Sequence, residues 1–436
     1  MDGVFGRGPR PKVAVVGAGI SGLSAAWLLR RSCDVTLYEA EPRLGGHADT
    51  QCVEVEGEAV AVDTGFIVYN EANYPNLVAL FDALGIATEP SDMSFGVSIG
   101  GGRLEYAGGD WPQLFAQKRN VLRPRFLGML RDVMRFYREA PALLDGADDV
   151  LTLGEYLERN RYGAAFVHDH LLPMGAAIWS ASVEGMRTFP ARAFVRFFQN
   201  HGLLRLTGRP QWRTVTGGSR RYVARIAADL GGRVLAGTRV RAVTRDAAGA
   251  WVHVDAAPAR RFDRVVLAVH GDIALRLLDP PTEAERAVLS AVRYQDNAMV
   301  LHTDPALMPK RRGVWSSWNY LARGPADETR EVAVSYWMNR LQNLRTRRPL
   351  IASLNPFADP DPRTVLVAKS YRHPQYDPAM LRAQGALPAL QGADRVWFCG
   401  AWCGYGFHED GIASAVRVAA SMGVPAPWSA PATAAA

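Results

Sequence analysis

The pattern of apolar and polar positions at the start of the chain predicts a β-α-β unit. Val13–Val16 is a continuous apolar run of the kind that forms a buried strand. Gly17–Arg31 then repeats apolar side chains at helical spacing, and Val35–Glu39 is a second strand-like run. A glycine-rich turn therefore connects the first strand to the helix.

The pattern changes character along the rest of the chain. Helical periodicity dominates from about Pro75 to Leu204, most clearly over residues 126–138. Alternation between residues 293 and 372 predicts an antiparallel sheet, with its clearest strands at 300–303, 332–338 and 364–371. The remaining signals are two strands within 233–254 around a turn at Asp246–Gly249, strands at 263–269 and 396–399, and a helix at 411–422.

The order of these elements favours an α/β fold with two interleaved parts. Strands and helices alternate near both ends of the chain, which suits one parallel sheet, whereas 293–372 suits an antiparallel sheet. A nucleotide-binding domain interrupted by a substrate domain accounts for this order better than two consecutive domains.

The composition is that of a globular protein. The chain has 436 residues, of which 48% are hydrophobic and 21% charged, enough for two or three domains. The net charge of +7 comes almost entirely from arginine, and we expect no nucleic-acid partner from it alone. We find no secretory signal and no apolar run of roughly 20 residues, so we expect a cytoplasmic protein.

The four cysteines, Cys33, Cys52, Cys399 and Cys403, are too few for a disulfide framework and fit a reducing compartment. Cys399 and Cys403 are four positions apart, but no second pair or histidine cluster completes a metal site. We therefore expect no metal.

The turn after the first strand has the spacing of a dinucleotide-binding site. Gly17 permits the tight turn, Gly19 lets a pyrophosphate approach the backbone, and Gly22 allows the helix to pack closely on the strand. Ile20 and Ser21 stand at the helix N-terminus, whose free N–H groups and dipole favour phosphate. The segment predicts nucleotide binding.

The motif extends beyond the second strand. Glu39 ends that strand 22 residues after Gly17, where a carboxylate accepts hydrogen bonds from the adenosine ribose. The run from Glu39 through Gly46 resembles the E-x-x-x-R-x-G-G extension of the FAD-dependent amine oxidase, phytoene desaturase and protoporphyrinogen oxidase superfamily. The resemblance implies that Arg43 neutralises pyrophosphate charge. The implied FAD contacts in this run are Glu39, Ala40, Arg43, Gly45, Gly46 and His47.

Further segments along the chain agree with this resemblance. Residues 62–66 resemble the superfamily's next strand and turn. Residues 214–223 resemble its P-x-G-G-x-x-x-L element, with Thr216 in place of proline. Residues 237–244 resemble the strand that recognises adenine, which implies a backbone contact from Val240. Residues 263–278 match the strand and helix that follow, with His270 where proline is common.

Residues 397–420 resemble the superfamily's flavin-end motif, in which a helix N-terminus points at the isoalloxazine and stabilises negative charge there. Ala401 departs from the pattern, because an acidic residue usually holds the ribityl chain at that position. We expect backbone contacts or Asp410 to replace it. The implied FAD contacts are Gly400, Ala401, Asp410, Gly411 and Ile412.

Nearly end to end, the chain also resembles predicted NAD/FAD-binding proteins encoded beside cyclopropane-fatty-acyl-phospholipid-synthase-like methyltransferases. This resemblance implies a lipid methyltransferase as a candidate partner. The segments that carry it are 65–77, 90–98, 120–126, 174–180, 315–320, 336–342 and 404–411.

These motifs predict a Rossmann-like, glutathione-reductase-type FAD-binding domain interleaved with an α+β substrate domain that contains an antiparallel sheet. The FAD-binding domain takes residues 12–70, 205–290 and 385–424, the substrate domain takes 71–204 and 291–384, and residues 1–11 and 425–436 form disordered tails.

The flavin-end loop supplies the candidate catalytic residues. Phe407 matches a position that forms an aromatic wall of the substrate cage in monoamine oxidases, and Trp402 either lines the same site or packs the core. His408 is the candidate acid–base group, because an imidazole with an ordinary pKa near about 6.5 suits proton transfer. Glu409 or Asp410 could orient its ring.

Amine oxidation is less favoured than the superfamily name suggests. Enzymes of that kind usually carry a lysine that contacts the flavin through water, early in the strand after the helix of residues 272–278. The matching position in this chain is Asn297. The sequence therefore favours a different substrate.

The helix predicted over residues 124–138 has two distinct faces. It is either a core-packing helix with a solvated arginine face or a surface helix that lies on an anionic membrane. One face carries Phe126, Met129, Leu130, Val133, Met134 and Tyr137, and the other carries Arg131, Arg135 and Arg138.

The sequence as a whole predicts an FAD-dependent dehydrogenase, desaturase or oxidase. We expect hydride transfer from an apolar substrate, such as an unsaturated or methylated fatty acyl chain, to flavin N5. The alternatives are an amine oxidase, a non-redox flavin-dependent isomerase or mutase, and an FAD-containing accessory protein of a lipid methyltransferase. A peripheral position at the inner membrane surface accompanies the lipid hypothesis.

Overall fold

The computed structural model describes residues 9–109, 111–146, 151–179, 181–255, 257–325 and 330–429. Its first layer is a five-stranded parallel sheet in the order β10-β2-β1-β14-β20. These strands are β1 (Lys12–Val16), β2 (Asp34–Tyr38), β10 (Val234–Leu235), β14 (Arg264–Leu267) and β20 (Val396–Phe398). The strands come from three distant parts of the sequence, as the predicted Rossmann-like domain requires.

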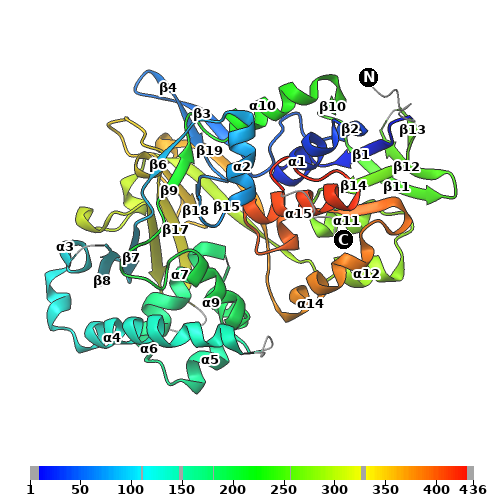
Figure 1. Ribbon diagram of the computed structural model, residues 1–436. Helices are drawn as coiled ribbons and strands as arrows, with labels where there is room; N and C mark the ends of the chain where they lie inside the picture. The colour runs from blue at the N-terminus through cyan, green and yellow to red at the C-terminus, as the bar shows by residue number, and fades with distance from the viewer. Residues whose placement is uncertain are drawn as a thin grey trace, which may run out of the picture.

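Helix α1 (Ile20–Leu29) follows β1 and is buried on every side. It packs between the parallel sheet, α10 (Arg220–Leu230) and α15 (His408–Ser421), which is why its sequence is apolar all round rather than amphipathic. Figure 1 shows α1 and α15 side by side against β1 and β14.

A three-stranded antiparallel meander, β11 (Val240–Asp246), β12 (Gly249–Val254) and β13 (Ala257–Phe262), extends from this domain. The predicted turn at Asp246–Gly249 is confirmed, and the Asp246 carboxylate accepts hydrogen bonds from the backbone N–H groups of Ala248 and Gly249. The third strand was not predicted, because its sequence, APARRF, has a proline and two arginines.

The second layer is a seven-stranded mixed sheet in the order β19-β15-β18-β17-β16-β7-β8. It is antiparallel except where β16 pairs with β7. The predicted antiparallel sheet over residues 293–372 is confirmed. Its strands are β7 (Phe95–Ile99), β8 (Leu104–Gly108), β15 (Tyr294–His302), β16 (Trp318–Arg323), β17 (Glu331–Trp337), β18 (Ile351–Leu354) and β19 (Val365–Pro374).

The prediction that residues 75–204 are mainly helical missed three strands. Strands β7 and β8 of this sheet lie inside that block, and so does β6 (Thr88–Ser91). They are four or five residues long, so their alternation is too short to stand out against the longer helical pattern.

Helices gather at one end of the antiparallel sheet (Figure 1). Helix α7 packs against β16 and β17, helix α3 packs against β8, and the others pack around α7 and on one another. They are α3 (Trp111–Leu114), α4 (Pro124–Glu139), α5 (Leu153–Arg159), α6 (Ala164–Phe166), α7 (Leu172–Trp179), α8 (Val183–Arg187) and α9 (Ala191–Asn200).

Shorter elements complete the fold. They include the ribbon β3–β4 and the three-stranded sheet β5-β9-β6, and Figure 1 draws β3, β4, β6 and β9 on the side of the antiparallel sheet. The elements not yet given are β3 (Thr50–Val55), β4 (Glu58–Asp63), β5 (Val68–Asn70), β9 (Trp212–Val215), α11 (Gly271–Leu277), α12 (Glu283–Leu289), α13 (Met338–Leu341) and α14 (Pro378–Ala386).

Helix α2 (Pro75–Leu84) shifts the predicted boundary between residues 70 and 71. The helix falls in the predicted substrate segment, yet Leu77, Leu80 and Phe81 are buried in the same core as α1 and α15. The Glu409 carboxylate of α15 also accepts hydrogen bonds from the backbone N–H groups of Asn76 and Leu77. The structure therefore places α2 with the nucleotide-binding part.

The predicted C-terminal tail, 425–436, is ordered over its first residues. The Trp428 ring stacks on Trp27 with centroids 6.2 Å apart, and its indole N–H donates to the Asn76 side chain at 3.0 Å. Disorder was therefore wrong for residues 425–429, because one tryptophan gives them an apolar contact. At the other end, the Pro11 carbonyl accepts from Asp34 N at 2.9 Å. Residues 1–8 and 430–436 lie outside the described residues.

Within the described part of the chain, no helix combines the length and the apolar character that crossing a membrane requires.

Candidate functional site

The turn between β1 and α1 is shaped by its glycines. Gly17 has φ = +99°, and a Cβ there would lie 2.7 Å from the Ala268 carbonyl oxygen. A Cβ on Gly22 would overlap the Gly17 carbonyl, which explains the close approach of helix and strand. Gly19 is different, because a Cβ there would meet no protein atom within 4 Å. The space beside Gly19 is open to the cavity and could accept a ligand.

The N-terminus of α1 faces that space. Gly19 is the N-cap, no side chain caps the helix, and its first turn carries no acidic residue. Ile20 and Ser21 line the cavity there. Uncapped N–H groups and the positive end of the helix dipole favour an anionic ligand such as a diphosphate.

Glu39 closes one side of the same cavity. Its carboxylate accepts hydrogen bonds from Ala18 N at 2.7 Å and Glu41 N at 2.9 Å. The segment before β11 runs beside it, since Thr238 N donates to the Glu39 carbonyl at 2.7 Å. Val240, at the start of β11, is buried and does not line the cavity; neither does Ala40.

Arg43 has a different role from the one expected. Its guanidinium donates to the carbonyl oxygens of Leu44, Gly46 and Ala48 at 3.1, 2.8 and 3.0 Å. It also lies 3.5 Å from the buried Asp49 carboxylate. Through these contacts Arg43 holds the shape of the turn, and it is not among the residues that line the cavity.

The paired glycines lie in the turn that Arg43 holds. Gly45 and Gly46 have φ of +115° and +57°, a region that favours glycine. A Cβ on Gly46 would be 3.1 Å from the Gly19 Cα, so the two glycine turns touch, and Gly46 lines the cavity. Gly45 lies behind it.

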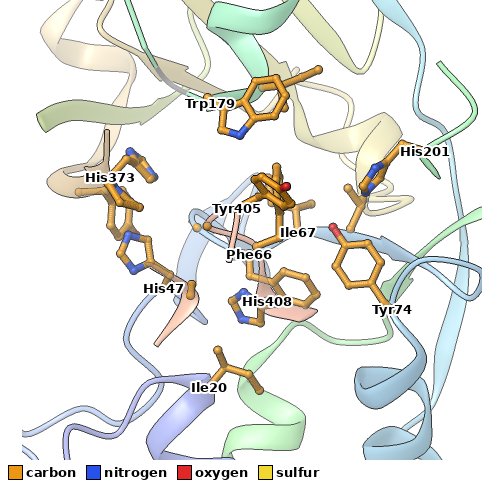
Figure 2. A pocket seen from close by; sticks show the side chains of 18 of the residues that line it. Ile20, His47, Phe66, Ile67, Tyr74, Trp179, His201, His373, Tyr405 and His408 are labelled. Atoms are coloured by element: carbon orange, nitrogen blue, oxygen red, sulfur yellow. The ribbon is translucent and has the colours of Figure 1, made fainter. Parts of the chain in front are cut away.

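Three histidines form one wall of the cavity. His47 and His373, seen together in Figure 2, have ring centroids 5.4 Å apart, and His270 lies 6.1 Å from His47. Burial lowers the pKa of each, to about 4 for His270 and about 3 for His373. His47 Nε2 and His270 Nδ1 are buried without a hydrogen-bond partner in the described residues. A neutral wall with two unused nitrogen atoms could hydrogen-bond a polar ring.

The loop before α15 forms the opposite end of the nucleotide region. Gly400, Ala401 and Trp402 line the cavity there. The Trp402 indole N–H donates to the Val269 carbonyl at 3.1 Å, and Gly400 N donates to Ser414 Oγ at 2.9 Å. Trp402 thus lines the site and packs the core at once.

Asp410, Gly411 and Ile412 do not line the cavity. The Asp410 carboxylate accepts from Phe407 N at 3.0 Å, and burial raises its pKa to about 6. It therefore caps α15, and the structure does not support it as the replacement for the acidic residue missing at Ala401. A Cβ on Gly411 would clash with α1, and Ile412 is fully buried.

His408 lies at the bottom of the cavity (Figure 2). Its ring stacks on Phe66 with centroids 3.7 Å apart, and Nε2 is 3.0 Å from the Tyr222 hydroxyl. Burial, with a smaller contribution from His47, holds the pKa of His408 well below 6.5. The expectation that Glu409 or Asp410 orients this ring was wrong, because both carboxylates bind backbone N–H groups instead.

Sequence reasoning missed Tyr222. Burial raises its pKa well above 10, so its hydroxyl stays protonated beside His408. It lies in α10, 186 residues before His408, and the motif of residues 214–223 was its only signal in the sequence.

An aromatic wall faces the histidine wall. Phe407 stacks on Phe197 with ring centroids 4.8 Å apart, and Trp179 and His201 lie 6.3 and 6.0 Å from Phe407. In Figure 2, Trp179, His201 and Tyr74 surround the side of the cavity opposite His47. Phe407 is thus placed where the sequence predicted an aromatic wall.

The cavity has a volume of about 850 Å³ and continues from the glycine turns to the antiparallel sheet. Six strands of that sheet each contribute an apolar or aromatic side chain to it. These are Phe95, Tyr106, Met299, Trp318, Tyr336 and Leu354.

Asn297 lies behind the histidine wall rather than in the cavity. It is fully buried, its amide nitrogen is 2.8 Å from His373 Nδ1, and its oxygen accepts from Asn355 at 2.7 Å. Among the described residues, no group of His, Cys, Asp or Glu side chains is arranged to hold a metal.

The site fits a dinucleotide. The space open at Gly19, the uncapped helix N-terminus and the Glu39 carboxylate suit the diphosphate and ribose. The unpartnered nitrogens of His47 and His270 suit a ring with polar edges.

The sequence matches the family described as flavin containing amine oxidoreductase over residues 20–311. The chain belongs to this family. Its cofactor is FAD, and it is an FAD-dependent oxidoreductase.

Curated relatives match only in part. The chain is 34% identical over 134 residues to the carotenoid phi-ring synthase of Chlorobaculum tepidum, covering 30% of this chain and 20% of the synthase. It is 51% identical over 57 residues to the tryptophan 2-monooxygenase of Pantoea agglomerans pv. gypsophilae, covering 12% of this chain and 10% of the monooxygenase. The chain thus spans a fifth or less of the length of these relatives.

Solved structures match over nearly the whole chain. A putrescine oxidase bound to putrescine covers 95% of this chain and 99% of its own, with a TM-score of 0.67 and 18% identity. The cyclohexylamine oxidase of Brevibacterium oxydans covers 95% of this chain and 99% of its own, with a TM-score of 0.68 and 16% identity. A CLA-producing fatty acid isomerase from P. acnes covers 94% of this chain and 98% of its own, with a TM-score of 0.66 and 15% identity. At these identities the likeness shows a shared fold.

Proposed function

We propose that this FAD-dependent oxidoreductase acts on an apolar substrate, of which an unsaturated or methylated fatty acyl chain is the best-fitting class. The observation that carries the proposal is the wall of the cavity beyond the glycine turns. Met174 and Ile178 of α7, Phe197 of α9, and Met299 and Leu354 of the antiparallel sheet all face it. Burying a hydrocarbon chain against such a wall is favourable by about 0.8 kcal/mol for each CH₂ group.

The charges around the cavity support the same substrate class. Glu39 and Asp92 are the carboxylates that line it among the described residues. Glu39 binds two backbone N–H groups, and Asp92 pairs with Arg340 at 3.0 Å and binds Ser317 at 2.7 Å. Neither is left unpaired for an ammonium group. The histidine wall is neutral because burial lowers each pKa.

Bound FAD supplies a hydride acceptor. Removing hydride from one carbon of a hydrocarbon requires a proton to leave its neighbour, and we assign that proton to His408. Burial lowers its pKa well below 6.5, so the imidazole is neutral at pH 7 and can accept a proton, but it is a weaker base than the ordinary imidazole that the sequence predicted. The Tyr222 hydroxyl and the Phe66 ring hold the imidazole in one plane. Phe407 and Phe197 position the chain beside it and exclude water.

The compared proteins offer two precedents for this substrate class. The fatty acid isomerase from P. acnes shares the fold, and the carotenoid phi-ring synthases share a segment of sequence. The isomerase also keeps the non-redox alternative open, because a shift of a double bond needs no net oxidation.

Amine oxidation is the second candidate. The observation in its favour is the aromatic wall at Phe407, together with the full-length likeness to putrescine oxidase and cyclohexylamine oxidase. Two observations count against amine oxidation. Asn297 occupies the sequence position at which these enzymes usually have lysine, and it does not line the cavity. The two carboxylates that line the cavity, Glu39 and Asp92, already have partners.

The lipids of cells with and without the protein test the proposal. Cells that carry the chain should contain acyl chains with an altered number or position of double bonds, or with altered methyl branches. Cells that carry Gly19→Val, which we expect to lack FAD, should not. Identical acyl profiles in the two strains would contradict the proposal. A changed profile with Gly19→Val as well would instead point to an accessory role beside a lipid methyltransferase.

A further inference from the structure

The surface formed by residues 111–138 exposes an unusual number of large apolar side chains. Seven such side chains are exposed among the described residues, and five of them lie in this segment. Leu122 is 84% exposed and Trp111 is 73% exposed, so neither contributes to the core. The other three are Val121, Leu127 and Met134. An exposed apolar group of this size marks an interaction surface.

Helix α4 explains how the segment can be apolar on two sides. Its inner side, with Phe126, Met129 and Phe136, is buried in the core. Residues three, four and seven apart share a helix face, so Leu127 and Met134 lie on one outer stripe with Arg131 and Arg138. The inner side therefore packs in the core, while the outer side is exposed. Met134 was wrongly assigned to the inner side.

The same surface is strongly basic. Residues 111–138 contain seven arginine and lysine residues and one acidic residue, Asp132, which is buried and binds Gly163 N. Lys118, Arg119 and Arg123 have no carboxylate partner among the described residues. Arg119 and Arg123 both donate to the Arg103 carbonyl, at 2.8 and 2.9 Å, which brings their charges together. Arg135, by contrast, pairs with Glu139 at 2.8 Å.

The cavity reaches the surface beside this segment. Tyr137, on the last turns of α4, lines the cavity, and so does Arg209, which is itself exposed. The Arg209 guanidinium lies close enough to the Tyr137 hydroxyl to oppose the rise in its pKa that burial causes. Leu206, 63% exposed, lies three residues before Arg209, whose side chain bends back to the Arg205 carbonyl at 2.9 Å. The mouth thus combines exposed apolar and basic groups.

We propose that the face made of residues 111–138 and Leu206 docks on an anionic lipid bilayer, with the mouth at Tyr137 and Arg209 turned toward it. Trp111, Leu122 and Met134 enter the interface, and the arginines bind lipid phosphates. A nucleic acid would use the arginines but gain nothing from exposed leucine and tryptophan. The docking proposal depends only on the surface just described. Direct entry of a substrate from the bilayer into the cavity rests, in addition, on the proposed function.

Co-sedimentation of the FAD-loaded protein with vesicles tests the proposal. Wild type should bind vesicles of phosphatidylglycerol and phosphatidylcholine, more weakly as salt rises, and bind pure phosphatidylcholine poorly. The Lys118→Ala, Arg119→Ala, Arg123→Ala triple variant should bind roughly 100-fold more weakly, since each basic residue near an anionic surface contributes about 5-fold. The Trp111→Ser, Leu122→Ser double variant should also lose binding, and what remains should be more sensitive to salt.

Matched variants elsewhere in the chain provide controls. Val365→Ser removes an exposed apolar side chain of β19, and the Arg286→Ala, Arg345→Ala, Arg347→Ala triple variant removes three exposed charges. Both should bind vesicles like wild type. Equal binding by all variants, loss in the control variants, or tighter binding to duplex DNA than to vesicles would overturn the proposal.

Activity separates this proposal from the proposed function. None of the five substituted surface residues lines the cavity. Turnover of a detergent-solubilised acyl substrate should therefore be unchanged in both surface variants, while turnover of the same substrate held in vesicles should fall with vesicle binding. If vesicle binding changes as expected but no acyl substrate is turned over, docking holds and the proposed function fails.

Discussion

At the scale of single residues, the glycines of the first turn separate ligand binding from folding. Gly17 has a positive φ and no room for a side chain, whereas a Cβ on Gly19 would meet open space. We expect Gly19→Val to fold with nearly unchanged thermal stability but to lose FAD, because valine fills the space the diphosphate needs. Absorption of the purified protein measures FAD content.

Gly128→Ala in α4 is the matched control, since a Cβ there also meets nothing within 4 Å. It should keep about one FAD per chain. A yellow, FAD-loaded Gly19→Val protein would show that the diphosphate binds elsewhere.

His408 carries the residue-scale prediction about chemistry. His408→Ala should keep its FAD but lose about 10²- to 10⁴-fold in turnover, the usual contribution of a general base. Because burial holds its pKa well below 6.5, His408 stays neutral as the pH falls from 8 to 6.5, and turnover should not fall over that range on its account. Tyr222→Phe should change turnover less than His408→Ala. Near-normal flavin reduction by His408→Ala would make the residue structural.

The sequence predicted where the glycine turn lies, because that turn is local. Gly17, Gly19 and Gly22 lie between β1 and α1, and Glu39 follows β2, as their spacing indicated. For Arg43 the sequence indicated a charge near the diphosphate, and the structure adds that it binds the carbonyl groups of its own turn. The sequence could not show this, since it does not say which way a long side chain points.

At the scale of elements, long or strongly periodic segments were predictable. The β-α-β unit, helix α4 and the strands β15, β17 and β19 all lie where their patterns placed them. Strands β6, β7 and β13 were missed because they are short, or polar on exposed edges. Their pairing partners decide their conformation, and those partners are far away in the sequence.

The C-terminal segment gives the element-scale prediction. Trp428 stacks on Trp27 and binds Asn76, so it ties the end of the chain to α1 and α2. Trp428→Ala should lower the free energy of unfolding by about 1 to 3 kcal/mol through lost apolar burial. Trp111→Ala, at a 73% exposed site, should change it by less than about 0.5 kcal/mol. Denaturant unfolding measures both, and equal effects would mean that the tail does not contribute.

At the scale of the whole molecule, buried histidines should make the protein acid-sensitive. Seven of the nine histidines have a pKa lowered by burial, to about 4 for His170, His201 and His302. In the unfolded chain they titrate near about 6.5. The unfolded state therefore binds more protons as pH falls below 6.5, and stability is lost between pH 6.5 and 4.

His170, His201 and His302, whose pKa falls to about 4, should each lower the free energy of unfolding by roughly 1 to 2 kcal/mol at pH 5. The melting temperature should therefore drop steeply from pH 7 to pH 5, and His302→Gln should reduce the drop. His253, which shows no such burial and lies on the meander, offers the control substitution. A melting temperature that is flat over this range would contradict the neutral, buried histidine wall.

The overall architecture followed from the order of elements and from the family motifs, because a parallel sheet assembled from both ends of a chain leaves few alternatives. The substrate cavity did not follow. Its wall draws on α7, α9 and six strands of a sheet, so it exists only once those elements are packed.

The most direct test of the account is anaerobic mixing of the FAD-loaded protein with two sets of compounds, followed by the visible absorption of the flavin. Unsaturated and methylated fatty acids should bleach the flavin and yield an acyl product with one more double bond. Putrescine and cyclohexylamine should leave the absorption unchanged. Rapid bleaching by the amines, with none by any acyl chain, would contradict the account and identify the protein as an amine oxidase.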